Sequence, residues 1–149
     1  MPYPEIMIRG MRQELTGVGV EEAKTPEQVI DAVENTDGTL MVFVNSVCGC
    51  AAGAARPGIA MALQNDLKPT KSISVFAGAD IDATDVARDY FKGYTPSSPS
   101  IALLNKGEVV FILERRDIEG RHPQQIAQAL TEAFDKFCAT DGSANAANN

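Results

Sequence analysis

Three apolar segments of the chain have the composition of buried β-strands. Residues 39–45, TLMVFVN, are continuously apolar with β-branched and aromatic side chains, which predicts a strand buried on both faces of a sheet. Residues 72–78, SISVFAG, predict a second buried strand. Within residues 101–114, IALLN and EVVFILE are separated by Lys106-Gly107, a spacing typical of an antiparallel hairpin.

The segments before the first buried strand have helical periodicity. Residues 4–14 place Ile6, Met7 and Met11 on one face of a predicted helix, and a short edge strand is expected around Val18 to Val20. The next segment, TPEQVIDAVENTDG, predicts a helix that begins after Thr25. There Thr25 and Gln28 form a capping box, Pro26 occupies the first turn, and Val29, Ile30 and Val33 form an apolar stripe.

Helices also alternate with the strands in the rest of the chain. Residues 51–67 are predicted to be helical with an interruption at Pro57-Gly58, and residues 82–93 predict a helix capped by Asp82 or Thr84 and stopped by Gly93. The last helix is predicted from an apolar face formed by Ile126, Leu130, Phe134 and Phe137.

This order of elements predicts one α/β domain. A parallel βαβ half is followed by an antiparallel hairpin and a covering helix, which is typical of a three-layer sandwich with a mixed central sheet flanked by helices, as in the thioredoxin-like fold. We expect a single domain over residues 1–138 and a disordered polar tail over residues 139–149, because ATDGSANAANN has almost nothing to bury.

Composition and charge exclude several classes of partner. The 149 residues include 13 Lys and Arg against 20 Asp and Glu, a net charge of -7, which argues against nucleic acid or an anionic membrane as partners. The N-terminal residues lack an apolar stretch of signal-peptide length, and the apolar run Leu40 to Val44 is too short to cross a bilayer. A cytoplasmic location is therefore expected, while nothing in the chain indicates an oligomeric state.

The chain contains three cysteines, and two of them lie in the motif Cys48-Gly49-Cys50, directly after the first buried strand. A cysteine between a strand and a helix start faces unpaired backbone N–H groups, which favour the thiolate. Thiolate is the attacking species in thiol–disulfide exchange, and a second nearby cysteine can resolve the mixed disulfide. Cys48 is therefore the candidate nucleophile and Cys50 the candidate resolving residue.

The spacing of the two cysteines limits this hypothesis. Residues i and i+2 of a regular helix point to nearly opposite sides, so a Cys48–Cys50 bond requires irregular backbone. Gly49 is expected to supply it by adopting positive φ. The ring is smaller than that of a CxxC pair, which favours an oxidising or isomerising couple over a strong reductant.

Two alternatives to redox chemistry remain open from the residues alone. The pair could consist of two buried thiols without chemistry, or it could belong to a metal-binding or metal-delivery module. Zinc prefers four N or S ligands, and beyond the pair the chain offers only Cys138 and His122, which we interpret as a packing or surface thiol and an exposed or capping residue. We therefore assign no metal site.

Several separated blocks of the sequence resemble one family. VCGCAAGAARPG, YTPSSPSIALLNKGEVVFILERRDIEGRHP and MPYPEIMIRGMRQELTGVG closely resemble the bacilliredoxins, thioredoxin-like proteins with a CGC motif, over residues 1 to 138. The resemblance implies thiol–disulfide exchange on protein mixed disulfides, with removal of the low-molecular-weight thiol bacillithiol and weak disulfide isomerase or reductase activity. It implies Cys48 as the nucleophile, Cys50 as the resolving residue, and no bound cofactor.

The resemblance also suggests supporting residues. Pro99 matches the cis-proline that thioredoxin-like proteins place opposite the active cysteines, and Ser98 would offer backbone hydrogen bonds to a substrate segment. Arg56 is close enough in sequence to favour a thiolate or an anionic small thiol, although a solvated helix arginine is the favoured interpretation. Unlike thioredoxins proper, the chain has no Trp and its strand TLMVFVN has no carboxylate, so proton transfer has no assigned residue.

Overall fold

The computed structural model describes residues 2–138, and the tail predicted for residues 139–149 lies outside them. Its elements follow the predicted order: α1 (Glu5–Thr16), β1 (Glu21–Glu22), α2 (Pro26–Asn35), β2 (Thr39–Asn45), the π-helical turn η1 (Ala51–Ala55), α3 (Arg56–Ala62), β3 (Lys71–Phe76), α4 (Ile81–Asp89), β4 (Ser100–Asn105), β5 (Glu108–Leu113), α5 (Arg115–Ile118) and α6 (Pro123–Phe137).

The strands form one mixed sheet in the order β1-β3-β2-β4-β5. The β1, β3 and β2 strands are parallel, whereas β4 runs antiparallel to β2 and β5 antiparallel to β4. The hairpin turns at Lys106 and Gly107, which both adopt positive φ (53° and 83°), as a two-residue turn of this kind requires. The predicted combination of a parallel half and an antiparallel hairpin is confirmed.

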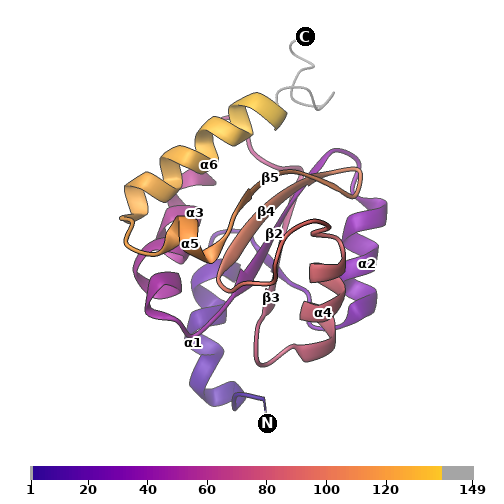
Figure 1. The fold of residues 1–149 in the computed structure, drawn as a ribbon, viewed down its shortest axis with the longest axis vertical. Helices are drawn as coiled ribbons and strands as arrows, with labels where there is room; N and C mark the ends of the chain where they lie inside the picture. Colours follow the sequence, from indigo (N-terminus) through magenta and orange to yellow (C-terminus); the bar gives the residue numbers. More distant parts are fainter. Residues whose placement is uncertain (1, 139–149) are drawn as a thin grey trace.

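Helices cover both faces of the sheet, which makes the molecule a three-layer sandwich (Figure 1). On β2, Met41 and Phe43 pack toward a core shared with α1, α3 and α6, while alternate residues such as Val42 pack toward α2 and α4. Every residue of β2 is buried, so the continuously apolar strand is central, as predicted. Gly58 of α3 lies so close to α6 that an added Cβ would come within 2.6 Å of the Ile126 Cβ.

The helix predicted after Thr25 begins as expected. The Thr25 hydroxyl accepts a hydrogen bond from Gln28 N–H at 3.2 Å, and the Gln28 side-chain oxygen accepts one from Thr25 N–H at 3.2 Å. The predicted cap of α4 by Asp82 or Thr84 is wrong, because the N-cap residue is Asp80 and its carboxylate bonds elsewhere. Residues 51–67 also differ from the prediction, since a π-helical turn precedes α3 and the helix ends at Ala62.

The predicted apolar face of α1 is wrong. Ile6 is 80 % exposed and Met7 52 %, while Ile8, Arg12 and Leu15 face the interior. Arg12 is buried because its guanidinium makes two hydrogen bonds to the Asp80 carboxylate, at 2.8 and 2.9 Å. The edge strand predicted at Val18 to Val20 lies instead at β1, after a turn that contains Gly19 in positive φ. Across residues 2–138, none of the helices has the length and apolar character needed to span a membrane.

Candidate functional site

The cysteine loop and Pro99 lie at the same edge of the sheet because of strand register. The β2 strand ends at Asn45, and its residue Val44 pairs with Ser100 at the start of β4. The segment that follows β2, which carries the CGC motif, therefore begins beside the residue that precedes β4. Residues far apart in sequence meet here through antiparallel pairing alone.

The two cysteines are free thiols in contact with each other. Cys48 Sγ and Cys50 Sγ are 2.7 Å apart, and the Cys50 N–H donates to Cys48 Sγ at 3.4 Å. The Cys48 carbonyl accepts from the N–H of Ala51 at 2.9 Å, which begins the helical turn. Both cysteines are half-buried. The arrangement places the two thiols of the CxC pair in contact.

Gly49 does not have the backbone conformation predicted for it. Gly49 is absent from the described residues with positive φ, and it lies in helical backbone with Cys50, whose φ and ψ are -70° and -25°. A Cβ at position 49 would meet nothing within 4 Å. The sulfur atoms reach each other because the side chains turn toward the same side at the start of the helix, so the reduced pair has no need of the glycine hinge.

The environment separates the acidities of the two thiols. The pKa of Cys48 is lowered, chiefly by the hydrogen bond from Cys50 and further by backbone N–H groups of Cys50 and Ala51 and the positive charge of Arg115, against a smaller opposing effect of burial. Burial, the hydrogen bond to Cys48 and the Cys48 charge raise the pKa of Cys50 to about 11. These shifts favour the thiolate at Cys48 and the protonated thiol at Cys50.

Arg56 is not the solvated helix arginine that the sequence favoured. It is 3 % exposed, and its guanidinium donates to Glu14 Oε1 at 2.9 Å, Asn45 Oδ1 at 2.9 Å and the Ser46 carbonyl at 3.0 Å. We call Glu14, Asn45, Ser46 and Arg56 the floor of the site. Arg56 is buried because three acceptors from α1 and from the end of β2 surround it.

The floor fixes the loop that leads to Cys48. The Asn45 side-chain oxygen accepts from Ser46 N–H at 2.9 Å, and the Ser46 hydroxyl accepts from Cys48 N–H at 3.1 Å. The position of Cys48 is therefore connected to Arg56 through two consecutive side chains. The charge among the main causes of the lowered Cys48 pKa is that of Arg115, not that of Arg56.

The arginine that acts on the sulfur atoms is Arg115, which the sequence analysis did not assign. Its guanidinium donates to the Ser98 carbonyl at 3.3 Å and to Glu119 Oε2 at 2.9 Å, and its backbone N–H donates to Ser97 Oγ at 3.3 Å. Ser97, Ser98, Arg115 and Glu119 form what we call the rim of the site. The hairpin contains a sequence signal for Arg115. The pairs of β4 and β5 run from Asn105 and Glu108 at the turn to Ile101 and Leu113 at the far end. Arg115 follows shortly after Leu113, so it lies near the residues that precede Ile101.

The other residues considered from sequence are placed as follows. The Ser98-Pro99 peptide bond is cis, as the match of Pro99 to the cis-proline position implied. His122 is exposed at the N-cap of α6, and Cys138 is buried with its Sγ 3.3 Å from Thr39 Oγ1. Over residues 2–138 there is no group of three His, Cys, Asp or Glu side chains that could hold a metal ion.

The structure is similar to solved thioredoxins. It matches a thioredoxin from Halobacterium salinarum with a TM-score of 0.56 over 80 % of this chain and 91 % of the other, at 12 % identity. It matches oxidised mitochondrial thioredoxin 3 from Saccharomyces cerevisiae with a TM-score of 0.55 over 83 % of this chain and 98 % of the other, at 11 % identity. These similarities confirm the predicted thioredoxin-like fold.

Sequence comparisons identify the family. The disulphide isomerase family profile matches residues 3–138. A bacilliredoxin from Koribacter versatilis is 58 % identical over 94 % of this chain and 97 % of its own length, and one from Halalkalibacterium halodurans is 49 % identical over 89 % and 91 %. The chain therefore belongs to the bacilliredoxin family of thioredoxin-like thiol–disulfide oxidoreductases, with its CxC pair at Cys48 and Cys50.

Proposed function

We propose that this protein removes a low-molecular-weight thiol, of the bacillithiol type, from mixed disulfides on protein cysteines. The observation that carries the proposal is the contact of 2.7 Å between Cys48 Sγ and Cys50 Sγ, with the pKa of Cys48 lowered and that of Cys50 raised to about 11. Because the two pKa values shift in opposite directions, Cys48 acts as the attacking thiolate and Cys50 as the protonated resolving thiol in this proposal. The family of the chain supports the same chemistry, and a cytoplasmic location is proposed with it.

The first step transfers the small thiol to the protein. The Cys48 thiolate attacks the sulfur of the small thiol in the mixed disulfide, the S–S bond to the substrate protein breaks, and the substrate cysteine leaves as a thiolate. A bond between Cys48 and the small thiol forms at the same time. The step exchanges one disulfide for another, so no outside oxidant or reductant takes part.

The second step releases the small thiol through Cys50. Once Cys48 is in a disulfide, it loses the negative charge that helped to raise the pKa of Cys50, and burial of Cys50 and the charge of Glu119 remain as the causes that raise it. Cys50 then gives up its proton more readily and attacks Cys48 Sγ. The small thiol leaves as a thiolate, and the Cys48–Cys50 disulfide waits for reduction by a second thiol.

The remaining residues predicted from sequence have supporting roles in this proposal. Pro99 and Ser98 lie at the start of β4, where an extended substrate segment would lie beside the cysteine loop. Arg56 holds that loop through Asn45 and Ser46. Gly49 is exposed between the two cysteines, and in this proposal its freedom of backbone conformation matters when the Cys48–Cys50 disulfide forms.

Mass analysis of trapped intermediates tests the proposal. The Cys50→Ser variant, incubated with a protein that carries bacillithiol on a cysteine, is expected to gain the mass of one bacillithiol at Cys48 and to release the substrate thiol. The parent protein is expected to end with a Cys48–Cys50 disulfide instead. Cys48→Ser is the matched control and should gain no adduct. If the Cys50→Ser variant gains none either, the proposed function is wrong.

A further inference from the structure

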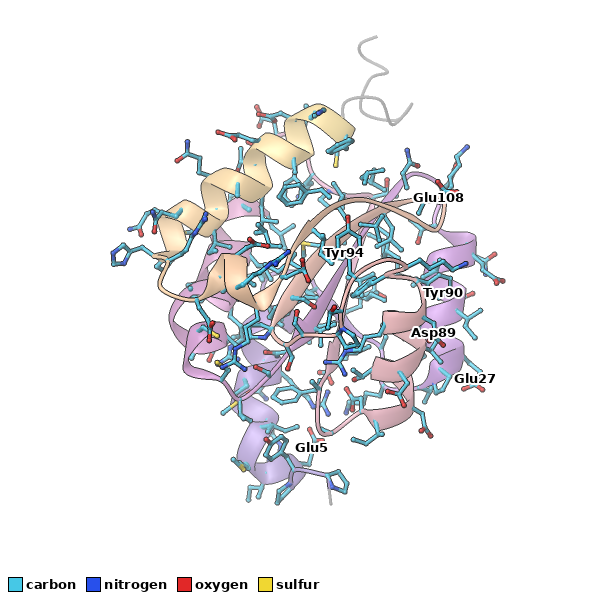
Figure 2. All side chains as sticks on the ribbon, viewed as in Figure 1. Glu5, Glu27, Asp89, Tyr90, Tyr94 and Glu108 are labelled. Carbon is cyan, nitrogen blue, oxygen red and sulfur yellow. The ribbon has the colours of Figure 1, made fainter. Side chains whose placement is uncertain are left out.

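A cleft of about 480 Å³ lies at the rim of the site, away from the floor. One wall is formed by residues 93–97, between α4 and β4, and the other by residues 114–116 with Glu119, at α5. Figure 2 labels Tyr94, the aromatic residue of the first wall. The volume lies within the usual range for small-molecule sites, roughly 300–1,000 Å³.

The cleft and the cysteines share two residues. Arg115 and Glu119 line the cleft. The Arg115 guanidinium donates at 3.3 Å to the carbonyl of Ser98, just before β4, and Ser100 of β4 pairs with Val44 at the end of β2 that leads into the cysteine loop. In keeping with this position, the charge of Arg115 lowers the pKa of Cys48 and that of Glu119 raises the pKa of Cys50. A molecule attached to Cys48 through sulfur would therefore find this cleft beside the point of attachment. Two hydrogen bonds, to the Ser98 carbonyl and to Glu119, hold the Arg115 guanidinium in place at this cleft.

The lining suits a polar ligand that carries carboxylate and hydroxyl groups. Arg115 is 46 % exposed in its side chain and Arg116 is 81 % exposed. Within the described part of the chain, two of the five N–H groups of the Arg115 guanidinium donate to protein acceptors, which leaves three donors for a ligand. Arg116 has one bond of this kind, to Glu114 at 3.2 Å. Guanidinium groups with free donors bind carboxylates well, and the hydroxyl-bearing Tyr94, Thr95 and Ser97 on the opposite wall suit hydroxyl groups.

We infer that this cleft binds the non-thiol part of the small thiol while its sulfur is joined to Cys48, with Arg115 contacting a carboxylate. The inference rests on the proposed function and adds to it a recognition site and a ligand chemistry. Protein segments would lie along the start of β4 at Ser98 and Pro99, whereas the small thiol would occupy the cleft on the other side of Arg115. Arg115 separates the two positions, because it lines the cleft and also bonds the Ser98 carbonyl.

A set of matched disulfides tests the assignment. Reduced Cys50→Ser protein is mixed separately with the symmetrical disulfides of carboxyethyl, hydroxyethyl and aminoethyl thiols, which differ in their terminal charge, and with bacillithiol disulfide. In each case the Cys48 thiolate attacks one sulfur of the disulfide, a mixed disulfide forms on Cys48, and the other half leaves as a thiolate. The rate at which this adduct forms is measured by mass spectrometry. Rates are corrected for the fraction of Cys48 thiolate in each variant, which is measured independently.

Adding Arg115→Gln is expected to lower the carboxyethyl-to-hydroxyethyl rate ratio about two- to fivefold, the effect of one exposed ion pair, and to lower the bacillithiol rate similarly. The aminoethyl rate should not fall relative to hydroxyethyl. Arg121→Gln, an exposed arginine outside the cleft, is the matched control. In addition, the backbone amide resonances within residues 93–97, those of Gly93, Tyr94, Thr95 and Ser97, should shift when the Cys48 adduct is bacillithiol and not when it is hydroxyethyl thiol.

The outcomes separate this inference from the proposed function. If Cys48 reacts with every disulfide but Arg115→Gln lowers all corrected rates by one common factor, or if residues 93–97 show no shift with bacillithiol, the cleft is not the binding site. The proposed function survives that result. If Cys48 forms no adduct with any disulfide, both the function and the inference fail.

Discussion

The floor and the rim of the site each contain one arginine, and the two arginines do different work. Arg56, in the floor, is buried and surrounded by Glu14, Asn45 and the Ser46 carbonyl. Arg115, in the rim, is exposed and acts on the charge of the two sulfur atoms. Arg56 is the closer of the two to Cys48 in sequence, yet Arg115 is the one whose charge is among the main causes that lower the pKa of Cys48.

The comparison shows how burial assigns a role to a charged side chain. A buried guanidinium must be matched by local acceptors, so its charge is neutralised where it stands and its contribution is to hold backbone in place. An exposed guanidinium keeps free donors and a field that reaches neighbouring groups, although solvent weakens it. We therefore expect changes in the floor to alter stability, and changes in the rim to alter reactivity.

The largest effect is expected from Arg56→Ala. The substitution leaves Asn45 Oδ1 and the Ser46 carbonyl without their buried donor, and it should lower the free energy of unfolding by about 3 kcal/mol, as for other broken networks of buried charged hydrogen bonds. Denaturant unfolding of the reduced protein measures the loss. Arg121→Ala, at an exposed arginine, is the control and should change stability by less than about 0.5 kcal/mol.

The pKa of Cys48 in the folded fraction of Arg56→Ala completes this test. The pKa of Cys48 should stay close to that of the parent protein even though the protein is less stable, because Arg56 is not among the main groups that shift this pKa. If Arg56→Ala kept full stability while the pKa of Cys48 rose markedly, Arg56 would act on reactivity and not on stability, and the roles given to floor and rim would be wrong.

The next effect in size is expected at Cys48 itself, from Cys50→Ala. The hydrogen bond from Cys50 is the largest cause of the lowered pKa of Cys48, so its loss should raise that pKa. A raised pKa reduces the thiolate fraction below it, so alkylation of Cys48 by iodoacetamide near pH 7 should slow about tenfold and recover at alkaline pH. An unchanged pH profile would mean that backbone N–H groups and Arg115 control Cys48 without Cys50.

Sequence reasoning succeeded where the information is local. The strand β2, the capping box at Thr25 and the hairpin turn at Lys106-Gly107 follow from side chains within a few residues of one another. The CGC pair also belongs to this group, because its position after a buried strand is visible in the chain. The cis bond before Pro99 came from the family resemblance, since few X–Pro bonds are cis.

Three of the failures, at Arg12, Arg56 and Arg115, concern charges whose partners are distant in sequence. Arg12 is buried because Asp80, 68 residues later, accepts from it, and this turned α1 away from its apolar face. Arg56 is buried by Glu14, 42 residues earlier. Arg115 lies at the site because of the register of the hairpin. That register could have been worked out from the position of the turn. Tertiary pairing of charges was the information that periodicity could not supply.

A smaller effect is expected from Arg115→Gln, which tests the rim directly. Its positive charge lowers the pKa of Cys48, so removing it should raise that pKa slightly and slow Cys48 alkylation at pH 7 about two- to threefold, since exposed charges interact weakly. At pH values above the Cys48 pKa the rates of parent and variant should converge. High salt should reduce the difference between them, whereas a difference that persists in salt would indicate a structural change instead of a charge effect.

The smallest effect on the reduced protein is expected from Gly49→Ala, a substitution between the two cysteines and outside both floor and rim. Gly49 has helical backbone and open space around it, so alanine should leave the reduced protein as stable as before or more stable by up to about 1 kcal/mol. The alkylation profile of Cys48 should stay the same. A large loss of stability would show that the glycine is needed in the dithiol state after all. If the reduced protein is unaffected while the Cys48–Cys50 disulfide becomes harder to form against a glutathione buffer, the requirement for glycine is confined to the oxidised state, where the bridge forces the backbone to change.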